Sequence, residues 1–335
     1  MRKLRVRSLR FDIFPLLLFL LFFSGADKGI FPLVMDPIPA DPGAILAYPM
    51  ESWRDRRYEV FRWDAFPQIL IFDTASYAVQ DRLFKRLAFF VEKEGFRGRL
   101  AADAEIAALH GWNAHDYRAE DLAAFFETAR VSKFPLLPEE LELEAILLET
   151  GILMRNSGGN PGGDPRQNTA SELIPGRGAI ISLSRESDKT DRGLRPRFMA
   201  HEGFHGLYFI DEDFRLFSLR RWESFPAPAK KFLLSFFEFQ AYDTRDTNLV
   251  INEFMAHVLQ LPVSQAAWYF GDFQPNRMIA ASPRRSSSLP AREEVRDGRR
   301  YWPDLAEIFT AEAEVFSRYV NQRWGLAAGR VWRVR

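Results

Sequence analysis

The stretch Phe198-Met-Ala-His-Glu-Gly-Phe-His-Gly-Leu-Tyr-Phe209 holds two histidines four residues apart, and a glutamate directly follows the first. Residues four apart lie on the same face of a helix, so the imidazoles of His201 and His205 can reach one metal ion. Glu202 is rotated by one position, which brings it close enough to accept a proton from a water at the metal without being a ligand. The stretch therefore predicts a helix that carries two metal ligands and a general base.

The surroundings of this motif favour a metal site over an ordinary core helix. Apart from His201, Glu202 and His205, every residue from 198 to 209 is uncharged, so the helix can be buried with these three side chains facing a cleft. The alternative is a core helix in which hydrogen bonds satisfy all three, and burying them without a metal or another partner would be costly. The chain has no cysteine, so the ligands must be His, Asp or Glu, which is a set that suits zinc.

A catalytic zinc site needs a third protein ligand and leaves its fourth position to water. Glu253 belongs to the helical pattern at 247–260, and a carboxylate on a second helix facing the first would complete the site. His257 shares a helix face with Glu253 and would either bind the metal or brace a ligand. Asp211 follows the motif closely and would need a sharp turn, but the chain has tyrosine where glycine usually supplies it.

Two segments together resemble the gluzincin branch of the zincin metallopeptidases, the thermolysin-like arrangement. They are His201-Glu202-Gly-Phe-His205 and Asn252-Glu253-Phe-Met-Ala256. In that family both histidines and the downstream glutamate bind zinc, and the glutamate of the first motif is the general base. The resemblance implies these roles for His201, His205, Glu253 and Glu202. It spans roughly residues 198–257 and departs from the family at His257, where members often carry an aspartate that braces a zinc histidine.

The resemblance also implies where a substrate would bind. Zincin sheets typically present an edge strand beside the active-site helix, to which an extended peptide adds through backbone hydrogen bonds. The predicted strand at 179–184 is the candidate, with an ordinary core strand as the alternative. The developing oxyanion also needs a donor, commonly Tyr, His or Arg. The candidate substrate-binding residues are Ala179, Ile180, Ile181 and Ser182, and the candidate donors are Tyr242, Tyr269, Tyr301 and Tyr319.

Patterns elsewhere predict an α+β protein that is mostly helical. A short apolar run at 68–73 indicates a buried strand, and apolar positions at helical spacing follow from 79 to 94. We expect a mixed N-terminal region of unassigned role at 27–150, and a zincin-like catalytic domain with a small sheet and the motif helix at 151–335. Further helices are predicted at 119–130, from Pro138 to Gly151, and at 198–209, 228–239, 247–260 and 303–322.

Three segments fall outside these patterns. Residues 156–178 are rich in Gly, Pro and polar side chains, which indicates a domain junction, an active-site loop or a mobile segment. Residues 110–117 hold two histidines beside aromatic and amide side chains, and predict a recognition loop, a second metal site or a structural turn. Residues 282–300 are rich in Ser and Arg and predict an exposed loop.

The N-terminus has the features of a signal peptide. Basic residues are followed by an apolar run from Ile13 to Phe23, and Ser24-Gly25-Ala26 offers small residues for cleavage after Ala26. The run is shorter than the ~20 residues that span hydrocarbon, which favours a signal peptide at 1–26 over an uncleaved anchor. The sequence therefore predicts export to the periplasm or the exterior, with no stable membrane span after cleavage.

The charge balance gives no reason to expect a nucleic-acid partner. The chain carries 45 basic and 45 acidic residues, and removing residues 1–26, with five basic and one acidic, leaves 40 and 44, a net charge of −4. Polyanions are bound by basic surfaces, which this composition does not indicate. A peptide or protein substrate is the expected partner.

Together these features predict an exported zinc-dependent metallopeptidase. The first alternative is a zincin-fold hydrolase that acts on cell-wall crosslinks or other non-standard amides. The second is a non-catalytic binding protein, in which four protein ligands would close a structural zinc site. The base Glu202 beside the first histidine favours a catalytic site over a structural one.

Overall fold

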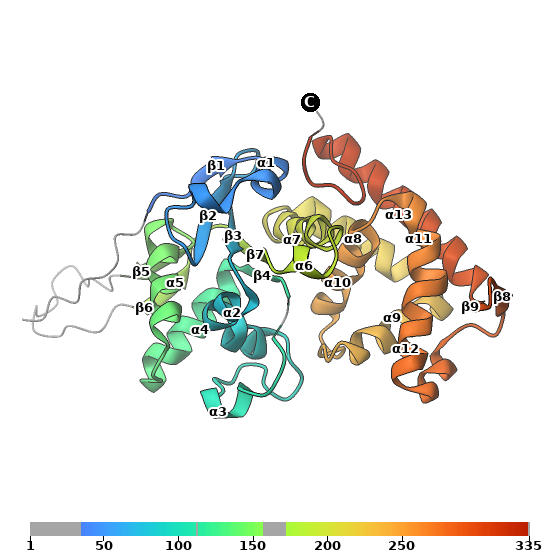
Figure 1. The fold of residues 1–335 in the computed structure, drawn as a ribbon. Coiled ribbons are helices and arrows are strands. Elements are labelled where there is room, and N and C mark those ends of the chain that lie inside the picture. The colour runs from blue at the N-terminus through green and yellow to red at the C-terminus, as the bar shows by residue number, and fades with distance from the viewer. Residues whose placement is uncertain (1–34, 112, 157–171, 334–335) are drawn as a thin grey trace, which may run out of the picture. The chain divides into compact units, whose positions relative to one another are not determined.

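A five-stranded mixed sheet lies between two groups of helices (Figure 1). This computed structural model describes residues 35–111, 113–156 and 172–333. The predicted signal peptide and most of the Gly- and Pro-rich segment 156–178 therefore lie outside the described residues. The strand order is β1-β2-β3-β7-β4, with four strands from before residue 150 and one from after it. The strands are β1 (Ile38–Ala40), β2 (Tyr58–Trp63), β3 (Ile69–Thr74), β4 (His115–Arg118) and β7 (Ala179–Ser184).

The central strands β3 and β7 run parallel and are buried on both faces. Leu70, Phe72 and Ile180 pack into the core on one side of the sheet, whereas Ile71 and Ile181 pack into the core on the other side. A strand that is covered on both faces has a nearly continuous apolar sequence, which explains why both strands are visible in the sequence. On the outside, β2 and β4 pair antiparallel with β3 and β7, and β1 pairs parallel with β2.

The helices α2, α4 and α5 cover one face of the sheet. Leu83 and Leu87 of α2 pack in one cluster with Leu122 of α4 and Leu143 of α5, so the three helices share a core with β3 and β7. The side chain of Ser76 accepts a hydrogen bond from a backbone N–H of α2 and so caps this helix. The elements of this part are α1 (Pro42–Ala47), η1 (Met50–Ser52), α2 (Tyr77–Val91), α3 (Asp103–Ile106), α4 (Ala119–Ser132), α5 (Pro138–Glu149), and the hairpin β5 (Leu153–Asn156) and β6 (Glu172–Pro175).

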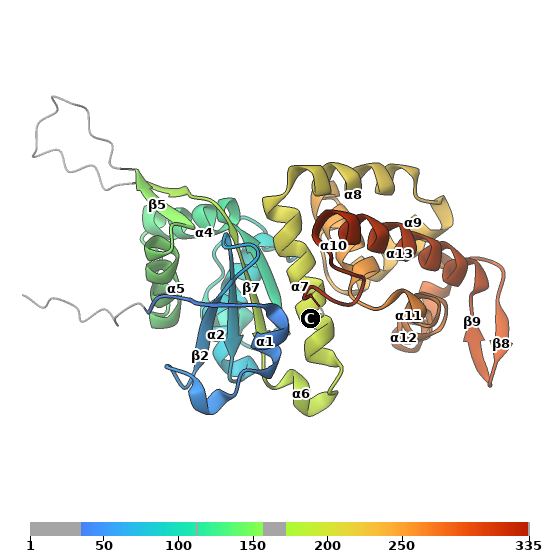
Figure 2. The same cartoon turned by 90° about the horizontal axis from the view of Figure 1, so that it is seen from above.

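The other face is covered by α7, which runs between the sheet and the C-terminal helices (Figure 2). Met199, Phe204 and Leu207 of α7 lie in one large core with Ile181 of β7 and Phe254 of α10. The elements here are α6 (Ser187–Thr190), α7 (Leu194–Ile210), α8 (Glu212–Ser224), α9 (Ala227–Phe239), α10 (Thr247–Leu259), α11 (Val263–Trp268), the π-helical turn η2 (Tyr269–Phe273), α12 (Gln274–Ala281), η3 (Pro283–Ser288), the hairpin β8 (Glu294–Arg296) and β9 (Arg299–Tyr301), and α13 (Pro303–Trp324).

Two glycines let α7 pack closely on both sides. A Cβ atom at Gly206 would lie 3.0 Å from Cδ1 of Ile69 on the sheet, and one at Gly203 would lie 2.9 Å from Cγ2 of Val331 near the C-terminus. Both distances are shorter than an ordinary carbon–carbon contact. Glycine at these positions therefore allows the helix that carries the motif to lie directly against the sheet.

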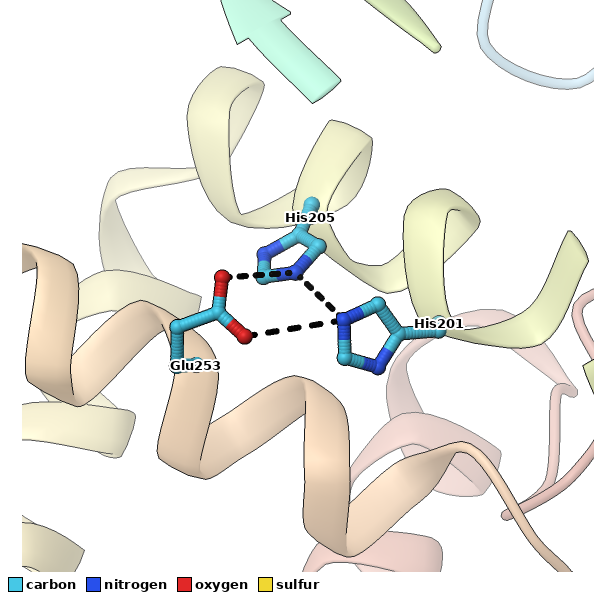
Figure 3. Close-up of side chains that lie close together, drawn as sticks. All are labelled: His201, His205 and Glu253. Atoms are coloured by element: carbon cyan, nitrogen blue, oxygen red, sulfur yellow. Dashed lines mark hydrogen bonds and ion pairs between the residues drawn. The ribbon is translucent and has the colours of Figure 1, made fainter. Parts of the chain in front are cut away.

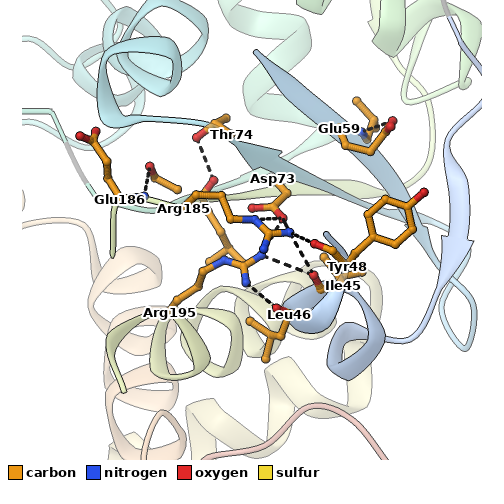
Figure 4. Close-up of polar contacts among 12 residues, drawn as sticks. Ile45, Leu46, Tyr48, Glu59, Asp73, Thr74, Arg185, Glu186 and Arg195 are labelled. Atoms are coloured by element: carbon orange, nitrogen blue, oxygen red, sulfur yellow. Dashed lines mark hydrogen bonds and ion pairs between the residues drawn. The ribbon is translucent and has the colours of Figure 1, made fainter. Parts of the chain in front are cut away.

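A buried ion cluster ties the start of α7 to the sheet and to α1 (Figure 4). Oδ2 of Asp73 on β3 accepts hydrogen bonds from Nη2 of Arg195 at 2.6 Å and from Nε of Arg185 at 2.9 Å. Arg195 also donates to the carbonyl oxygen of Leu46, and Arg185 to that of Tyr48. One carboxylate and two guanidinium groups thus satisfy backbone groups at the end of α1 while they anchor α7.

The position of β7 corrects one prediction. Because β3 and β4 pair with its two sides, β7 is an interior strand, and the expectation that Ala179 to Ser182 offer an edge to a substrate is wrong. The edge strand on this side is β4, which contacts α7 directly. The segment 110–117, for which a turn was one prediction, therefore contains the edge strand.

The coarse fold prediction is confirmed, since the protein is α+β and mostly helical. The expected helices near 79–94, 119–130 and 138–151, and all four later ones, are present. The sequence did not predict α8, α11 and α12, and the expected loop at 282–300 contains η3 and the β8–β9 hairpin. Among the described helices, none is both long and apolar enough to cross a membrane.

Candidate metal centre

The crossing of α7 and α10 brings His201, His205 and Glu253 together in the interior (Figure 3). The Nε2 atoms of the two histidines lie 3.1 Å apart. Oε2 of Glu253 lies 3.6 Å from Nε2 of His201, and Oε1 lies 3.7 Å from Nε2 of His205. Two ligands come from adjacent turns of one helix and the third comes from the facing helix, so all three donor atoms converge on one point.

The geometry of these three side chains fits a zinc ion. Ligand atoms bound tetrahedrally at about 2.0–2.1 Å from zinc lie roughly 3.3–3.4 Å from one another. The distances here run from 3.1 to 3.7 Å and involve both carboxylate oxygens of Glu253, so the three side chains lie close enough to share one ion. Oε2 of Glu253 is also buried without a hydrogen-bond partner among the described residues. A buried carboxylate oxygen in that state is costly, and a cation between it and the imidazoles would satisfy it.

Both histidines are held in the form that binds a metal. Burial lowers the pKa of His201 to about 3, and the positive charge of Arg197 acts in the same direction. Burial likewise lowers the pKa of His205 to about 4, although Glu253 partly opposes this shift. The neutral imidazole is the metal ligand, so both rings are ready to coordinate without first losing a proton at neutral pH.

Three buried carboxyl groups lie around the histidines. Burial raises the pKa of Glu202 well above its usual range, and repulsion from Asp116 and Glu253 raises it further. The pKa of Asp116 is also raised well above its usual range, mainly by burial and next by repulsion from Glu253. Burial raises the pKa of Glu253 as well. Several carboxylates cannot all ionise in a buried cluster without a compensating cation. A metal ion at the histidines would allow these groups to ionise.

Asp116 is the site residue that the sequence did not single out. It comes from β4, its Oδ2 lies 3.7 Å from Nδ1 of His205, and its carboxyl group hydrogen-bonds that of Glu202. Its neighbour His115 points to the opposite face of the sheet and packs against Phe84, as alternation along a strand requires. The polar composition of 110–117 was visible in the sequence, but the direction of each side chain depends on the pairing of β4 with β7.

Of the two other ligand candidates, His257 lies at the cluster and Asp211 does not. Nε2 of His257 lies 3.6 Å from Oε2 of Glu253, and its Nδ1 lies 2.7 Å from Nε2 of Gln260. Asp211 accepts a hydrogen bond from the backbone N–H of Phe214 and forms an ion pair with Arg323. Asp211 is therefore the N-cap of α8, and His257 is placed to orient Glu253.

Two of the four candidate oxyanion donors lie near the cluster. Tyr242 hydrogen-bonds Glu253, and Tyr269, from the π-helical turn η2, stacks on His257 with ring centroids 6.5 Å apart. Tyr301 instead packs under an arginine of the β8–β9 hairpin. Tyr319 stacks on a phenylalanine of α8. The structure thus brings Tyr242 and Tyr269 to the site and leaves Tyr301 and Tyr319 away from it.

Two clefts reach the cluster and share Glu92 and Asp116 in their walls. We name them cleft A, with an empty volume of about 900 Å³, and cleft B, with about 1150 Å³. Cleft A is lined by Val91, Arg97, Arg118, Glu120, Asp121, Tyr208, Phe209, Arg215, Asp246, Asn248, Leu249, Asn252 and Glu253 besides the shared pair. Cleft B is lined by His110, Asn113, Ala114, Leu194, Arg197, Phe198, His201, Glu202, Gln240, Tyr242, His257, Gln260, Tyr269, Gln274 and Arg277 besides the shared pair.

No protein-family model, curated protein or solved structure matches this chain.

Proposed function

We propose that this protein is an exported zinc-dependent metallopeptidase with a zincin-like catalytic domain of the gluzincin type. One observation carries the proposal: the ligand atoms of His201, His205 and Glu253 lie close enough together to bind one zinc ion. The carboxyl group of Glu202 lies on the same helix as the two histidines and in the wall of cleft B. A closed structural site would need a fourth protein ligand. Three ligands, with Glu253 in the wall of cleft A and His201 in the wall of cleft B, support a catalytic site instead.

A zinc ion held by these three residues would supply Lewis-acid chemistry and lower the pKa of water to about 7. Glu202 would do the proton transfer. Its carboxylate would accept a proton from the attacking water and deliver it to the nitrogen of the leaving amine. Burial and the neighbouring Asp116 raise the pKa of Glu202, which makes its carboxylate a stronger base than an exposed glutamate.

The edge strand β4 is the proposed place for the substrate backbone. An extended peptide can add to an unpaired strand edge by main-chain hydrogen bonds. Asp116 and Arg118 of this strand line the clefts, and Asp116 lies within reach of both Glu202 and His205. A peptide along β4 would therefore pass the metal cluster. Tyr242 and Tyr269 would then be the candidate hydrogen-bond donors to the oxyanion from cleft B.

The proposal is tested by metal content and turnover in the same preparations. We expect about one zinc per purified chain, which His201→Ala loses, and cleavage of an unstructured protein such as casein. Glu202→Gln should keep the zinc and lose the cleavage, because it removes only the proton carrier. Cleavage that survives Glu202→Gln would exclude the mechanism. A folded wild-type protein that takes up no zinc would exclude the metallopeptidase altogether.

A matched control is available on the same protein surface. Glu120 lines cleft A beside the site but makes none of the contacts that assign the chemistry. Glu120→Gln should therefore keep both zinc and cleavage. Cleavage of cell-wall peptides with no cleavage of casein would keep the zinc chemistry and change the substrate class.

A further inference from the structure

Cleft B contains two arginines that have no acidic partner in the part of the chain that the structure describes. Arg197 lies on α7, one turn before His201, and its Nε atom is buried without a hydrogen-bond partner. The central carbon of its guanidinium group lies 5.9 Å from the centre of the Phe198 ring. Arg277 lies on α12, and its guanidinium is 5.5 Å from the ring of Phe239. Aromatic contacts leave the hydrogen-bonding edges of a guanidinium group free.

Cleft A is different, because its arginines are already engaged. Arg97 forms an ion pair with Asp246, and Arg118 forms one with Asp121 at 3.0 Å. Arg215 donates to two carbonyl oxygens at the end of α7. Arginines without a hydrogen-bond or ion-pair partner among the described residues therefore distinguish cleft B from cleft A, although both clefts lead to the same metal cluster.

The two arginines lie in the wall of the same cleft. Arg197 and Arg277 both line cleft B together with His257. The carboxyl groups in the wall of this cleft, Glu92, Asp116 and Glu202, gather at the metal cluster. The rest of the wall offers neutral donors: Asn113, Gln240, Gln260, Tyr269 and Gln274.

We propose that cleft B binds a carboxylate of the substrate, with Arg197 and Arg277 as the residues that select it. The inference rests on the proposed peptide hydrolysis and names the substrate class, a peptide with a negative charge near the scissile bond. Arg197 and His201 are one helical turn apart, an axial rise of about 6 Å, and an extended peptide advances about 3.3 Å per residue. The carboxylate would therefore belong within about two residues of the bond that is cleaved.

The carboxylate has two chemical sources, and the test separates them. Calorimetric titration of zinc-loaded Glu202→Gln measures binding without turnover. One pair of probes is acetyl-Ala-Ala-Phe-Asp-Ala-amide and the same peptide with Asn for Asp. The other pair is acetyl-Ala-Ala-Phe-Ala with a free carboxyl terminus and with an amide. We expect the charged member of at least one pair to bind roughly tenfold or more tightly than its neutral partner, since each guanidinium would form charge-assisted hydrogen bonds.

The arginine substitutions are combined with Glu202→Gln in the same chain. Arg197→Gln with Arg277→Gln should abolish the preference for the charged peptide, while the double Lys variant should restore part of it through charge alone. Arg220→Gln is the control, because Arg220 is exposed on α8, outside cleft B, and forms no ion pair among the described residues. Equal zinc content and equal melting temperature would show that the fold is intact in every variant.

The outcomes separate this inference from the proposed function. No preference for charged peptides, or a preference that the double Gln variant retains, would overturn the carboxylate site even if the wild-type protein cleaves peptides. A preference that depends on both arginines would support the site even if the wild-type protein cleaves none of the probes. If the wild-type protein also cleaves neither casein nor cell-wall peptides, the peptidase proposal would fall and a carboxylate-binding cleft would remain.

Discussion

Asp116 faces His205 from the edge strand of the sheet, with its Oδ2 atom 3.7 Å from Nδ1 of the imidazole. No hydrogen bond joins the two groups at this distance. A carboxylate that closed on that nitrogen would brace the ring, because it would fix the ring's orientation and make it a stronger ligand. Asp116 comes from β4, which lies far earlier in the sequence than α7.

Asp116→Asn should weaken zinc binding by about 10–100-fold, the usual cost of losing such a brace, and leave the fold intact. Competition with a chromophoric chelator would measure the change in affinity. Asp121→Asn is the matched control, because Asp121 lies nearby in cleft A but pairs with Arg118. Equal zinc affinity in Asp116→Asn and wild type would show that Asp116 does not support the metal.

Glu253→Ala should lose zinc, whereas His257→Ala should keep it. Glu253 directs both carboxylate oxygens at the motif histidines, while His257 lies 3.6 Å from one of these oxygens and its other ring nitrogen is 2.7 Å from Nε2 of Gln260. Elemental analysis of the two purified variants would decide between them. If both lose their zinc, four protein ligands close the site, and the structural-zinc alternative gains support.

Zinc binding should release protons from carboxyl groups and not from histidines. The pKa values of about 3 for His201 and about 4 for His205 leave both rings neutral at pH 6, so they have no proton to lose. The raised pKa values of Glu202, Asp116 and Glu253 favour the protonated form of these carboxyl groups in the metal-free protein. Because a bound proton competes with the metal, zinc affinity should rise with pH.

Calorimetry of zinc binding at pH 6 in two buffers of different ionisation enthalpy would count these protons. We expect about one proton released per zinc, and fewer in Glu202→Gln. The absence of any release at pH 6 would contradict the carboxyl assignment.

Breaking the buried ion cluster should destabilise the protein strongly. Arg195→Met leaves Asp73 with one cationic partner instead of two and should cost about 3–5 kcal/mol, as is usual when one member of a buried pair is removed. Urea denaturation would measure the loss. Arg82→Met breaks a more exposed pair with Glu139 and should cost less than about 1 kcal/mol. Similar losses in both variants would show that the cluster adds no special stability.

The parts of the site that lie within single helices could be predicted from the sequence. The spacing of His201 and His205 is a local property of α7. It puts both imidazoles on one face of the helix whatever the rest of the fold is. Glu253 could be found because an acid in an apolar helix needs a buried partner. Asp116 could not, because a four-residue strand between two helices has no periodicity of its own and its pairing with β7 is a long-range choice.

The error about β7 has a physical reason that the sequence already contained. An edge strand usually shows polar residues on alternate positions, whereas Ile180 and Ile181 are adjacent and apolar, which is typical of a strand covered on both faces. Likewise, Asp211 precedes the α8 sequence as an N-cap would, so its side chain was more readily explained by capping than by metal binding. Both signals are local properties of the sequence.

The parallel pairing of β3 with β7 also limits the order in which this chain can fold. Ile69 pairs with Ala179, so the centre of the sheet can close only after the chain has been made as far as β7. Contacts between such distant residues carry a large loop-closure entropy and slow the folding reaction. Until then β3 exposes an apolar edge, which is a template for aggregation. During synthesis, the central strand β3 is thus a segment that needs protection from aggregation until β7 has been made.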